Sequence, residues 1–375
     1  MSEENVERMV WHPRPSAIVA ALYTLRDLDV DVAILHGPAG CCFRHSRMLE
    51  EDGMRVLTTA MEESDFVFGG HKLLVNALRF AEERFKPSLM GVVGTCSSMI
   101  IGEDLEKAVA DSGVKCKVIT VKVHAGYRDN TVGVIRTLEA AMLAGIISEE
   151  EFERQKRVLE RATEIEKRVG AASSEYIPPS KGDSKIAVAE RLLELLREGK
   201  RGVCVLNAKK ETAFMFADIL RALNKVAKEK QVVNIANLNK NVGLKRIRGY
   251  AERILNELNA ENIKIHHITG GLDEYAVAGE RAAKIICEEY ADYDFAVLVG
   301  VPHAVLPIPS GFEIFSVTNG PRTVEPLKSL GHHHVVLELD LHPKTMGATH
   351  ILPSEFGDAI LRLSRRNASR KGEMS

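Results

Sequence analysis

The sequence predicts an α/β protein whose strands form parallel sheets. Short apolar runs alternate with helical stretches along most of the 375 residues, which is the pattern of βαβ units. Several of these runs end in loops that carry glycine, histidine or cysteine. Apolar residues make up 45% of the chain and charged residues 27%, a balance that excludes disordered, collagen-like and coiled-coil proteins. At about 150 residues per domain, we expect two to three domains.

The first half begins with a helix near Ser16–Leu28, in which Ser16 is the expected N-cap. A second helix is expected at Lys72–Phe85. Three apolar runs are predicted strands, and each is followed by a short polar loop: Val30–Leu35, Leu89–Val93 and Lys117–Val123.

Residues 149–170 predict a surface helix, because this strongly charged segment carries apolar side chains on one helical face: Phe152, Leu159, Ile165 and Val169. Ala171–Ser184 combines Ser, Pro and Gly and is the predicted linker. Further strands are expected at Val203–Leu206, Gln231–Ile235, Ile263–His267, Phe295–Val299, Ile314–Val317 and Val335–Leu339. Helices are expected between them, near residues 211–228, 246–259 and 274–290.

This alternation predicts three parts. Residues 1–140 form an N-terminal α/β domain, and residues 141–184 form a helical connection and linker. Residues 185–375 form a C-terminal Rossmann-like α/β region that is open to further subdivision.

Charge and composition exclude some classes of partner. Lys and Arg number 50 against 52 Asp and Glu, and aromatic residues make up only 5%, so we expect no nucleic-acid partner. No apolar run approaches the roughly 20 residues that span a bilayer. The N-terminal residues are polar and lack the apolar core of a signal peptide. We therefore expect a cytoplasmic protein without a membrane partner.

Six cysteines are too sparse for a disulfide scaffold and lack zinc-finger or C-x-x-C spacing: Cys41, Cys42, Cys96, Cys116, Cys204 and Cys287. Cys41 stands at the expected start of a helix, where the helix dipole should favour its thiolate. Such a thiolate suits a nucleophile or an iron ligand, whereas a small buried cysteine is the structural alternative. The last three cysteines fall within predicted strands and helices, so we expect them in the core.

In open parallel sheets, ligands bind beyond the carboxyl ends of the strands. Two such loops of the same predicted sheet each carry cysteine, namely His36–Cys42 and Gly94–Cys96. The first loop bears glycines but lacks the Lys of a P-loop, so it is weak evidence for phosphate binding. The presence of cysteine in both loops is a stronger indication of a functional site than the glycines are.

Three motifs occur in a fixed order in residues 30–110: His36-Gly-Pro-Ala-Gly-Cys41, Glu63-Ser-Asp-Phe-Val-Phe-Gly-Gly70 and Gly94-Thr-Cys-Ser-Ser-Met-Ile-Ile-Gly-Glu-Asp-Leu105. Together they resemble nitrogenase component 1 and its relatives, which include the light-independent protochlorophyllide and chlorophyllide reductases. The resemblance implies an oxidoreductase of Rossmann-like domains that binds a 4Fe-4S cluster at a subunit interface. The cluster-binding positions are Cys41 and Cys96, both in the N-terminal domain.

The sequence departs from nitrogenase in ways that change the expected ligand set. Nitrogenase subunits have one further cysteine upstream of the glycine loop, and residues 1–40 here have none. A cubane takes about four thiolates, so a symmetric homodimer that supplies Cys41 and Cys96 twice is the simplest completion. Cys42 is the reserve ligand. The cysteine and histidine that hold the large nitrogenase metallocofactor have no convincing equivalent, so nitrogen fixation is not expected.

Within the family, the sequence is most similar to the methanogen reductive cyclases that act on a nickel tetrapyrrole. That similarity implies a catalytic subunit that reduces the macrocycle and closes a lactam ring, toward the nickel coenzyme of methyl-coenzyme M reductase. The nickel belongs to the substrate, and ATP is used by a nitrogenase-reductase-like iron–sulfur partner. Three alternatives stay open: a scaffold for a metallocofactor precursor, another nitrogenase-like tetrapyrrole reductase subunit, and a cluster-free α/β binding protein.

A tetrapyrrole with several carboxylates needs cations, and five basic residues in the expected loops are weak candidates: Arg44, His45, Arg47, Lys209 and Lys210. Charged loop residues are more often simply solvated. His124 and His303 follow predicted strands and are candidate proton donors. Glu63 and Asp65 either dock a partner or cap a helix, and capping is favoured. His332–His334 leads into a predicted strand, which favours a structural role over metal binding.

Overall fold

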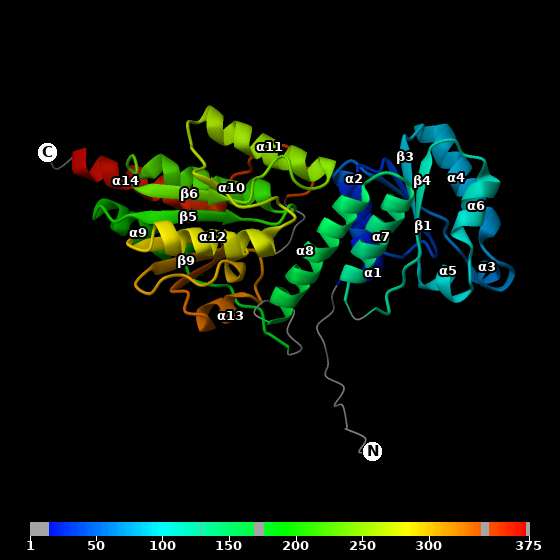
Figure 1. Ribbon diagram of the computed structural model, residues 1–375, viewed down its shortest axis with the longest axis horizontal. Coiled ribbons are helices and arrows are strands. Elements are labelled where there is room, and N and C mark those ends of the chain that lie inside the picture. The colour runs from blue at the N-terminus through cyan, green and yellow to red at the C-terminus, as the bar shows by residue number, and fades with distance from the viewer. Residues whose placement is uncertain (1–14, 128, 169–175, 339–344, 373–375) are drawn as a thin grey trace, which may run out of the picture. The chain divides into compact units, whose positions relative to one another are not determined.

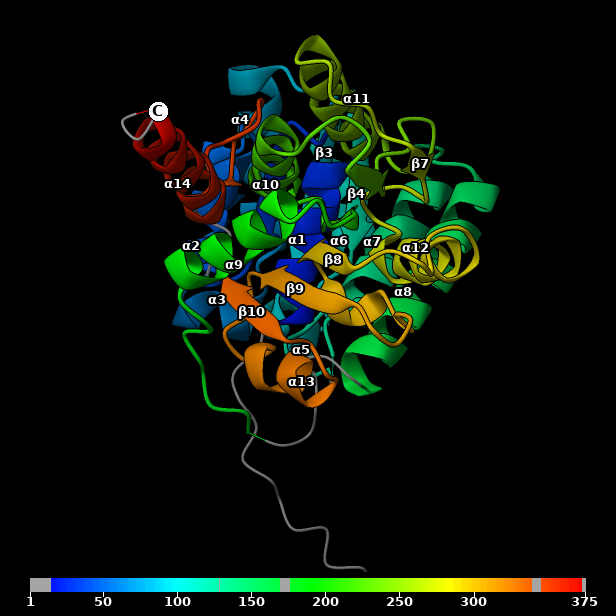
Figure 2. The ribbon, with the colours of Figure 1, turned by 90° about the vertical axis from the view of Figure 1, so that its left-hand side faces the viewer.

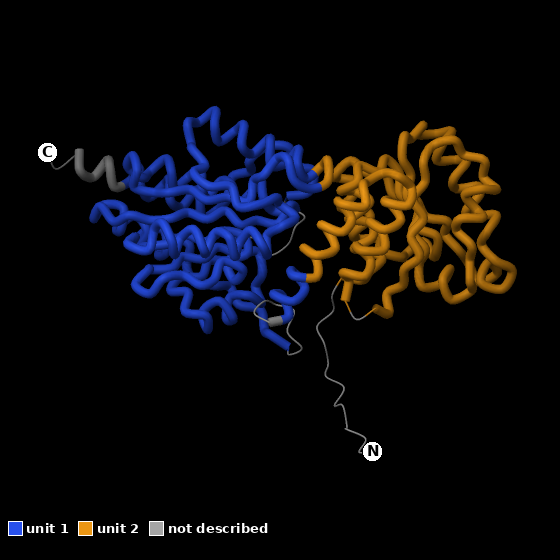
Figure 3. The backbone as a smooth tube through the Cα atoms, viewed as in Figure 1, with its two compact units in different colours: residues 1–13, 161–243, 247–375 blue, residues 14–160, 244–246 orange. Residues whose placement is uncertain are grey.

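The computed structural model describes residues 15–127, 129–168, 176–338 and 345–372, and it confirms the α/β class. Figure 3 shows the chain divided into two compact units. Unit 2 comprises residues 14–160 with 244–246, and unit 1 comprises 161–243 and 247–375 with 1–13. The expected domain limits stay a prediction, and residues 169–175 of the expected helix end and linker lie outside the described residues.

Unit 2 is built on a four-stranded parallel sheet with the order β2-β1-β3-β4 (Figure 1). The strands are β1 (Val32–His36), β2 (Arg55–Thr58), β3 (Leu89–Gly94) and β4 (Lys117–Val121). The helices are α1 (Ala17–Asp27), α2 (Phe43–Glu51), α3 (Glu63–Phe68), α4 (His71–Phe85), α5 (Cys96–Ile100), α6 (Leu105–Ser112), α7 (Thr131–Leu143) and the first part of α8 (Glu149–Arg168).

Helices cover both faces of this sheet, with α4 and α6 on one face and α1 and α7 on the other (Figure 1). Strands β1 and β3 are buried along their whole length, which explains why they appear in the sequence as unbroken apolar runs. Strand β2 is a half-exposed edge strand of four residues, and its short Arg-Val-Leu-Thr sequence gave no usable signal.

Local contacts set the ends of the first two elements. The Ser16 side chain accepts a hydrogen bond from the Val19 N–H, which confirms the predicted N-cap. Strand β1 begins later than predicted, because Asp29 has a left-handed φ of 58°. The Val30 N–H therefore donates to Leu25 O and closes the end of α1 rather than pairing with a strand.

Unit 1 is built on a six-stranded parallel sheet with the order β10-β9-β8-β5-β6-β7, and Figure 2 shows β8, β9 and β10 side by side. The strands are β5 (Gly202–Asn207), β6 (Val232–Ala236), β7 (His267–Ile268), β8 (Phe295–Gly300), β9 (Glu313–Thr318) and β10 (His334–Leu337). The helices are the end of α8, then α9 (Lys185–Arg197), α10 (Ala213–Val226), most of α11 (Lys245–Ala260), α12 (Tyr275–Glu289), the 3-10 turn η1 (Pro302–Ala304), α13 (Val324–Ser329) and α14 (Glu355–Gly372).

This strand order is the Rossmann order, which confirms the predicted Rossmann-like architecture. The predicted strand at Ile263–His267 is shorter than expected, since only β7 pairs with β6 there. The reason is local: His266 Nδ1 accepts the Asn234 N–H, so a side chain takes the place of a main-chain acceptor. Leu339, the last residue of the final predicted strand, lies outside the described residues.

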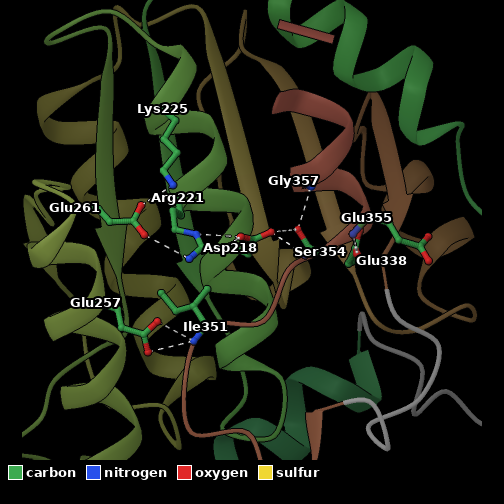
Figure 4. Close-up of polar contacts among 10 residues, drawn as sticks. All are labelled: Asp218, Arg221, Lys225, Glu257, Glu261, Glu338, Ile351, Ser354, Glu355 and Gly357. Carbon is green, nitrogen blue, oxygen red and sulfur yellow. Dashed lines mark hydrogen bonds and ion pairs between the residues drawn. The ribbon is translucent and has the colours of Figure 1, made fainter. Parts of the chain in front are cut away.

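Carboxylates fix the C-terminal segment of unit 1 (Figure 4). Asp218 on α10 is buried, and its Oδ2 accepts from the Ser354 N–H at 2.7 Å and from the Ser354 hydroxyl at 2.8 Å. Glu338 accepts the main-chain N–H groups at the start of α14, which satisfies donors that a helix end otherwise leaves free. Helix α14 then packs against α9 and α10.

We expect Asp218→Ala to lower the free energy of unfolding by about 3 kcal/mol, because it leaves buried donors of Ser354 and Arg221 unpaired. The control is Asp292→Ala, which removes an exposed pair with Arg201 and should cost less than about 1 kcal/mol. Denaturant unfolding of both variants measures the difference. Equal losses would show that the carboxylate does not fix the segment.

Candidate metal centre

Two cysteines of unit 2 lie at the same edge of its sheet. Strands β1 and β3 are neighbours, and their last residues, His36 and Gly94, are paired in register. Cys41 lies in the loop after β1, and Cys96 is the first residue of α5 after β3. Cys96 is close enough for its charge to raise the pKa of Cys41. The structure therefore brings together the two cysteines that the sequence predicted as partners.

A buried polar contact joins the three sequence motifs. The His36 side chain is fully buried, its Nδ1 lies 3.0 Å from Thr59 Oγ1, and its Nε2 lies 3.4 Å from Glu103 Oε2. Glu103 Oε1 accepts the Gly70 N–H at 2.5 Å. Burial lowers the pKa of His36, and the Glu103 carboxylate works in the opposite direction. One residue from each motif thus takes part in this contact.

Two glycines allow the loops to approach closely. A Cβ atom on Gly37 would lie 2.1 Å from Thr95 Oγ1, and the Thr95 hydroxyl donates to His36 O at 3.0 Å. A Cβ atom on Gly70 would lie 2.9 Å from His36 Cε1. A larger residue at position 37 would push apart the loops that carry Cys41 and Cys96, and one at position 70 would press on the Met61 side chain and the buried His36 ring.

The electrostatics of Cys41 differ from the sequence prediction. Helix α2 begins at Phe43, so Cys41 lies before its first turn. Burial raises the pKa of Cys41, and the neighbouring charge of Cys96 raises it further. The expectation that the helix dipole favours this thiolate is therefore wrong. A cation placed between the two sulfurs would offset their mutual repulsion.

Cys42 is held differently from the other two. It has a left-handed φ of 56°, and burial is the main cause that raises the pKa of its thiol to about 11. The charges of Cys41 and Cys96 contribute to this rise, while a hydrogen bond with Ser16 works against it. A thiol with this pKa stays protonated near neutral pH, which makes Cys42 the weaker iron ligand of the three.

The loop after β4 reaches Cys96. The Ala125 N–H donates to Cys96 Sγ at 3.1 Å. The His124 ring stacks on Tyr127 at 3.9 Å, and its Nδ1 accepts the Gly126 N–H at 3.1 Å. The sequence predicted His124 near a strand end. It could not predict the contact of Ala125 with Cys96, because a main-chain N–H donor does not depend on residue type.

Thiolates are soft ligands that suit iron, so the pair of Cys41 and Cys96 fits half of a four-thiolate cluster site. Within the described part of the chain, no group of three or more His, Cys, Asp or Glu side chains is placed to hold a metal ion. In the described residues, one copy offers two cysteines at this edge, with a main-chain N–H directed at the sulfur of Cys96.

The chain is similar in sequence to known proteins. Residues 16–164 match the family described as "Nitrogenase component 1 type Oxidoreductase". The chain is 54% identical to "Ni-sirohydrochlorin a,c-diamide reductive cyclase complex, component CfbD" of Methanosarcina acetivorans over 96% of its own length and 98% of that protein. It is 55% identical to the protein of the same name from Methanothermobacter thermautotrophicus, over 94% and 98%. The Methanocaldococcus jannaschii protein of that name is 46% identical, over 94% and 99%.

The chain belongs to the CfbD family. The predicted resemblance to nitrogenase component 1 and to its nickel tetrapyrrole branch is thereby confirmed, as is membership of an oxidoreductase family. No helix in the described residues has the length and apolar character needed to cross a membrane.

The acidic residues of the second motif have structural roles in this CfbD-family fold. Asp65 Oδ2 accepts the Glu62 N–H at 2.8 Å, and the Glu62 side chain caps α3 in return. The predicted capping role of Asp65 is confirmed. Glu63 lies in the exposed first turn of the same helix.

The candidate cations fall in two places. Arg44 and Arg47 are exposed on α2 just after the cysteines, Arg47 pairs with Glu50 at 2.7 Å, and His45 packs edge-on against Tyr23. Lys209, Lys210 and His303 belong to unit 1, whereas the cysteines belong to unit 2. Lys209 Nζ lies 2.9 Å from Glu166 Oε1, and Lys210 Nζ lies 4.0 Å from Glu211.

The remaining cysteines and histidines of this CfbD-family chain have their own environments. Cys204 is buried in β5 and Cys116 packs partly against the core, but Cys287 is exposed, so its predicted core position is wrong. Cys287 lies on α12, of which only one face is buried, and its position within a helix does not tell whether it lies on that face. His332 bonds to Ser316, His333 Nδ1 accepts the Ile314 N–H, and His334 pairs with Glu313.

Burial, together with the neighbouring charges of His303 and His333, lowers the pKa of His332 to about 4. The folded protein therefore binds fewer protons than the unfolded chain between about pH 6.5 and pH 4. The associated stability is fully present above this window and falls by up to about 3 kcal/mol as the pH drops through it. His332→Asn should remove most of this loss in denaturant unfolding at pH 7 and pH 4.5.

The control for this pH dependence is His350→Asn, which replaces an exposed histidine of the same unit. The control should keep the full acid sensitivity. An unchanged pH dependence in the His332 variant would contradict the assignment.

Proposed function

We propose that this chain is the catalytic component of an ATP-dependent reductive cyclase. Its substrate is nickel-sirohydrochlorin a,c-diamide, and the reaction reduces the macrocycle and closes its lactam ring, toward the nickel coenzyme of methyl-coenzyme M reductase. The observation that carries the proposal is the meeting of Cys41 and Cys96 beside the joined motifs. The identity of 46–55% with proteins named for this complex, over nearly the whole chain, supports the substrate.

We propose that Cys41 and Cys96 of two copies hold one 4Fe-4S cluster, with Cys42 as the reserve ligand. Two thiols per copy, arranged for one site, support a homodimer in which a two-fold axis supplies four. When bound, such a cluster supplies one-electron transfer. The Ala125 N–H donates to Cys96 Sγ, and the glycine contacts hold both loops in place. A cytoplasmic location is consistent with free thiols at these positions.

The proposed electron donor is a nitrogenase-reductase-like ATPase that binds transiently beside the cysteines. Three apolar side chains stand exposed at the ends of the motif helices: Val67 and Phe68 on α3, and Ile100 on α5. Phe68 is 87% exposed, and a group of exposed apolar residues is typical of a protein contact. Gly70 follows α3 and Glu103 follows α5, so the hydrogen bond between these two residues holds the two helices near each other. An electron donor that binds here lies next to the proposed cluster.

The cations of α2 and His124 complete the proposed site in unit 2. Arg44, His45 and Arg47 follow the cysteine loop directly and are proposed to attract the carboxylates of the substrate. His124, beside Cys96, is the proposed proton donor of this unit. Its Nδ1 accepts a hydrogen bond from the main chain, which leaves Nε2 to carry the exchangeable proton.

Turnover tests the function directly. Purified protein should form the reduced, cyclised product only when the iron–sulfur partner, a reductant and hydrolysable ATP are all present. Sustained reduction by this chain and a reductant alone would contradict the proposal. Binding of the tetrapyrrole without turnover in the complete mixture would indicate a scaffold instead.

The cysteine variants test the ligands. We expect Cys41→Ser and Cys96→Ser each to reduce bound iron to background after oxygen-free purification, because a serine oxygen is a poor ligand for the cluster. Cys287→Ser, at an exposed cysteine of the other unit, is the matched control and should keep full iron content. Iron content and electron paramagnetic resonance of the reduced protein are the measurements. Normal spectra in both loop variants would rule out these ligands.

A surface variant tests the partner contact. Phe68→Ala should raise the partner concentration needed for half-maximal turnover by about tenfold, as loss of a buried aromatic anchor typically costs about 1–2 kcal/mol at an interface. Iron content and tetrapyrrole binding should not change. Leu143→Ala, 79% exposed at the end of α7, is the control. If both variants behave alike, the contact lies elsewhere.

A further inference from the structure

Unit 1 contains a topological switch point at the carboxyl ends of β5 and β8. From β5 the chain continues to β6 and β7 on one side, and it then returns to β8, β9 and β10 on the other. The last residues of the two neighbouring strands, Asn207 and Gly300, are paired in register. Ligands of open α/β sheets bind at such a point, where the loops after the two strands diverge.

Buried polar atoms at this switch point lack a close hydrogen-bond partner. Among the residues that the structure describes, Asn207 Oδ1 and both ring nitrogens of His303 make no hydrogen bond. Asn207 is 1% exposed and His303 is 5% exposed. Buried polar atoms in folded proteins are nearly always paired, so these three atoms mark a place where a bound group or an ordered water would supply the missing partners. An unpaired amide oxygen needs a donor, and a neutral imidazole offers one donor and one acceptor.

A lysine stands beside these atoms. Lys209, two residues after Asn207, has its Nζ 2.9 Å from Glu166 Oε1 and 4.7 Å from the centre of the Tyr275 ring. His303 Nε2 lies 3.6 Å from the same Glu166 oxygen, too far for a good hydrogen bond. The Asn207 amide donates to Tyr275 O, which ties it to the same group of residues.

The lysine is charged and reachable. Although burial opposes ionisation, the Lys209 charge holds the pKa of Glu166 well below its usual range, so both members of the pair are ionised. About a third of the Lys209 side chain, 32%, is exposed. An ammonium group has three donors, so its pair with one carboxylate leaves capacity for a second.

We propose that Asn207, Lys209 and His303 form a binding subsite for the acidic and amide side chains of the tetrapyrrole. Lys209 binds a carboxylate, Asn207 Oδ1 accepts an amide N–H, and His303 bonds to the group between them. The inference rests on the proposed function, since a diamide that keeps other carboxylates offers both kinds of group. Unit 1 then contributes a substrate-binding subsite of its own, besides the cysteine site of unit 2.

The test is an absorbance titration of the full-length protein, purified without oxygen, with nickel-sirohydrochlorin a,c-diamide. Lys209→Met and His303→Ala should each weaken binding at least about tenfold, the loss of one hydrogen bond to a charged group. Lys328→Met is the matched control, because it removes another lysine–carboxylate pair of unit 1, with Asp183 at 2.9 Å. Binding by the control should stay within about twofold of wild type. Iron content, measured in parallel, should be equal in all variants.

A second probe compares two ligands on the same protein sample, so a loss of folded protein affects both alike. The methyl ester of the same tetrapyrrole lacks the carboxylate charge, so wild type should prefer the acid over the ester and Lys209→Met should lose part of that preference. Lys209→Arg, which keeps the charge, should retain it. An acid preference that is unchanged in Lys209→Met overturns the subsite while the proposed function stands. Failure of the wild type to bind either probe contradicts the proposed function, and the inference falls with it.

Discussion

The buried contact of His36, Glu103 and Gly70 is the interaction on which the cysteine site depends. It places an imidazole, a carboxylate and a main-chain N–H from three separate loops in one small volume. Each loop carries something that the proposed chemistry needs: Cys41, the exposed end of α3, and Cys96. A buried carboxylate is stable only with partners, so none of the three loops can move without leaving polar groups unpaired. The motifs occur together in the sequence because they are in contact in the fold.

The same geometry supports the proposed second copy. Burial and the neighbouring charge of Cys96 raise the pKa of Cys41, so in a lone copy the ionisation of Cys41 is unfavourable. Iron supplies the missing positive charge, but a cubane takes about four thiolates, and one copy offers two well-placed ones. The proposed homodimer meets both requirements. The exposed Phe68 and Ile100 near this edge are then available to a transient electron donor.

The sequence predicted the fold class, most elements and the meeting of Cys41 with Cys96, because buried parallel strands give unbroken apolar runs and their ends share one edge. It missed Glu103 and Glu166 as key residues. Their partners Gly70 and Lys209 lie 33 and 43 residues away, and glutamates in charged segments are usually solvated. The sequence also led to a wrong expectation for the ionisation of Cys41. It placed Cys41 at the start of a helix, whereas α2 begins two residues later, at Phe43. It also misplaced Cys287, because periodicity alone does not say how a helix is covered.

Two copies are proposed to complete one cluster site, and native mass spectrometry of the protein purified without oxygen can test this, since it counts chains and iron–sulfur units in the same particle. We expect a dimer that carries a single 4Fe-4S cluster and loses it when it separates into monomers. A monomer that keeps its cluster, or a dimer that carries two, would contradict the shared site.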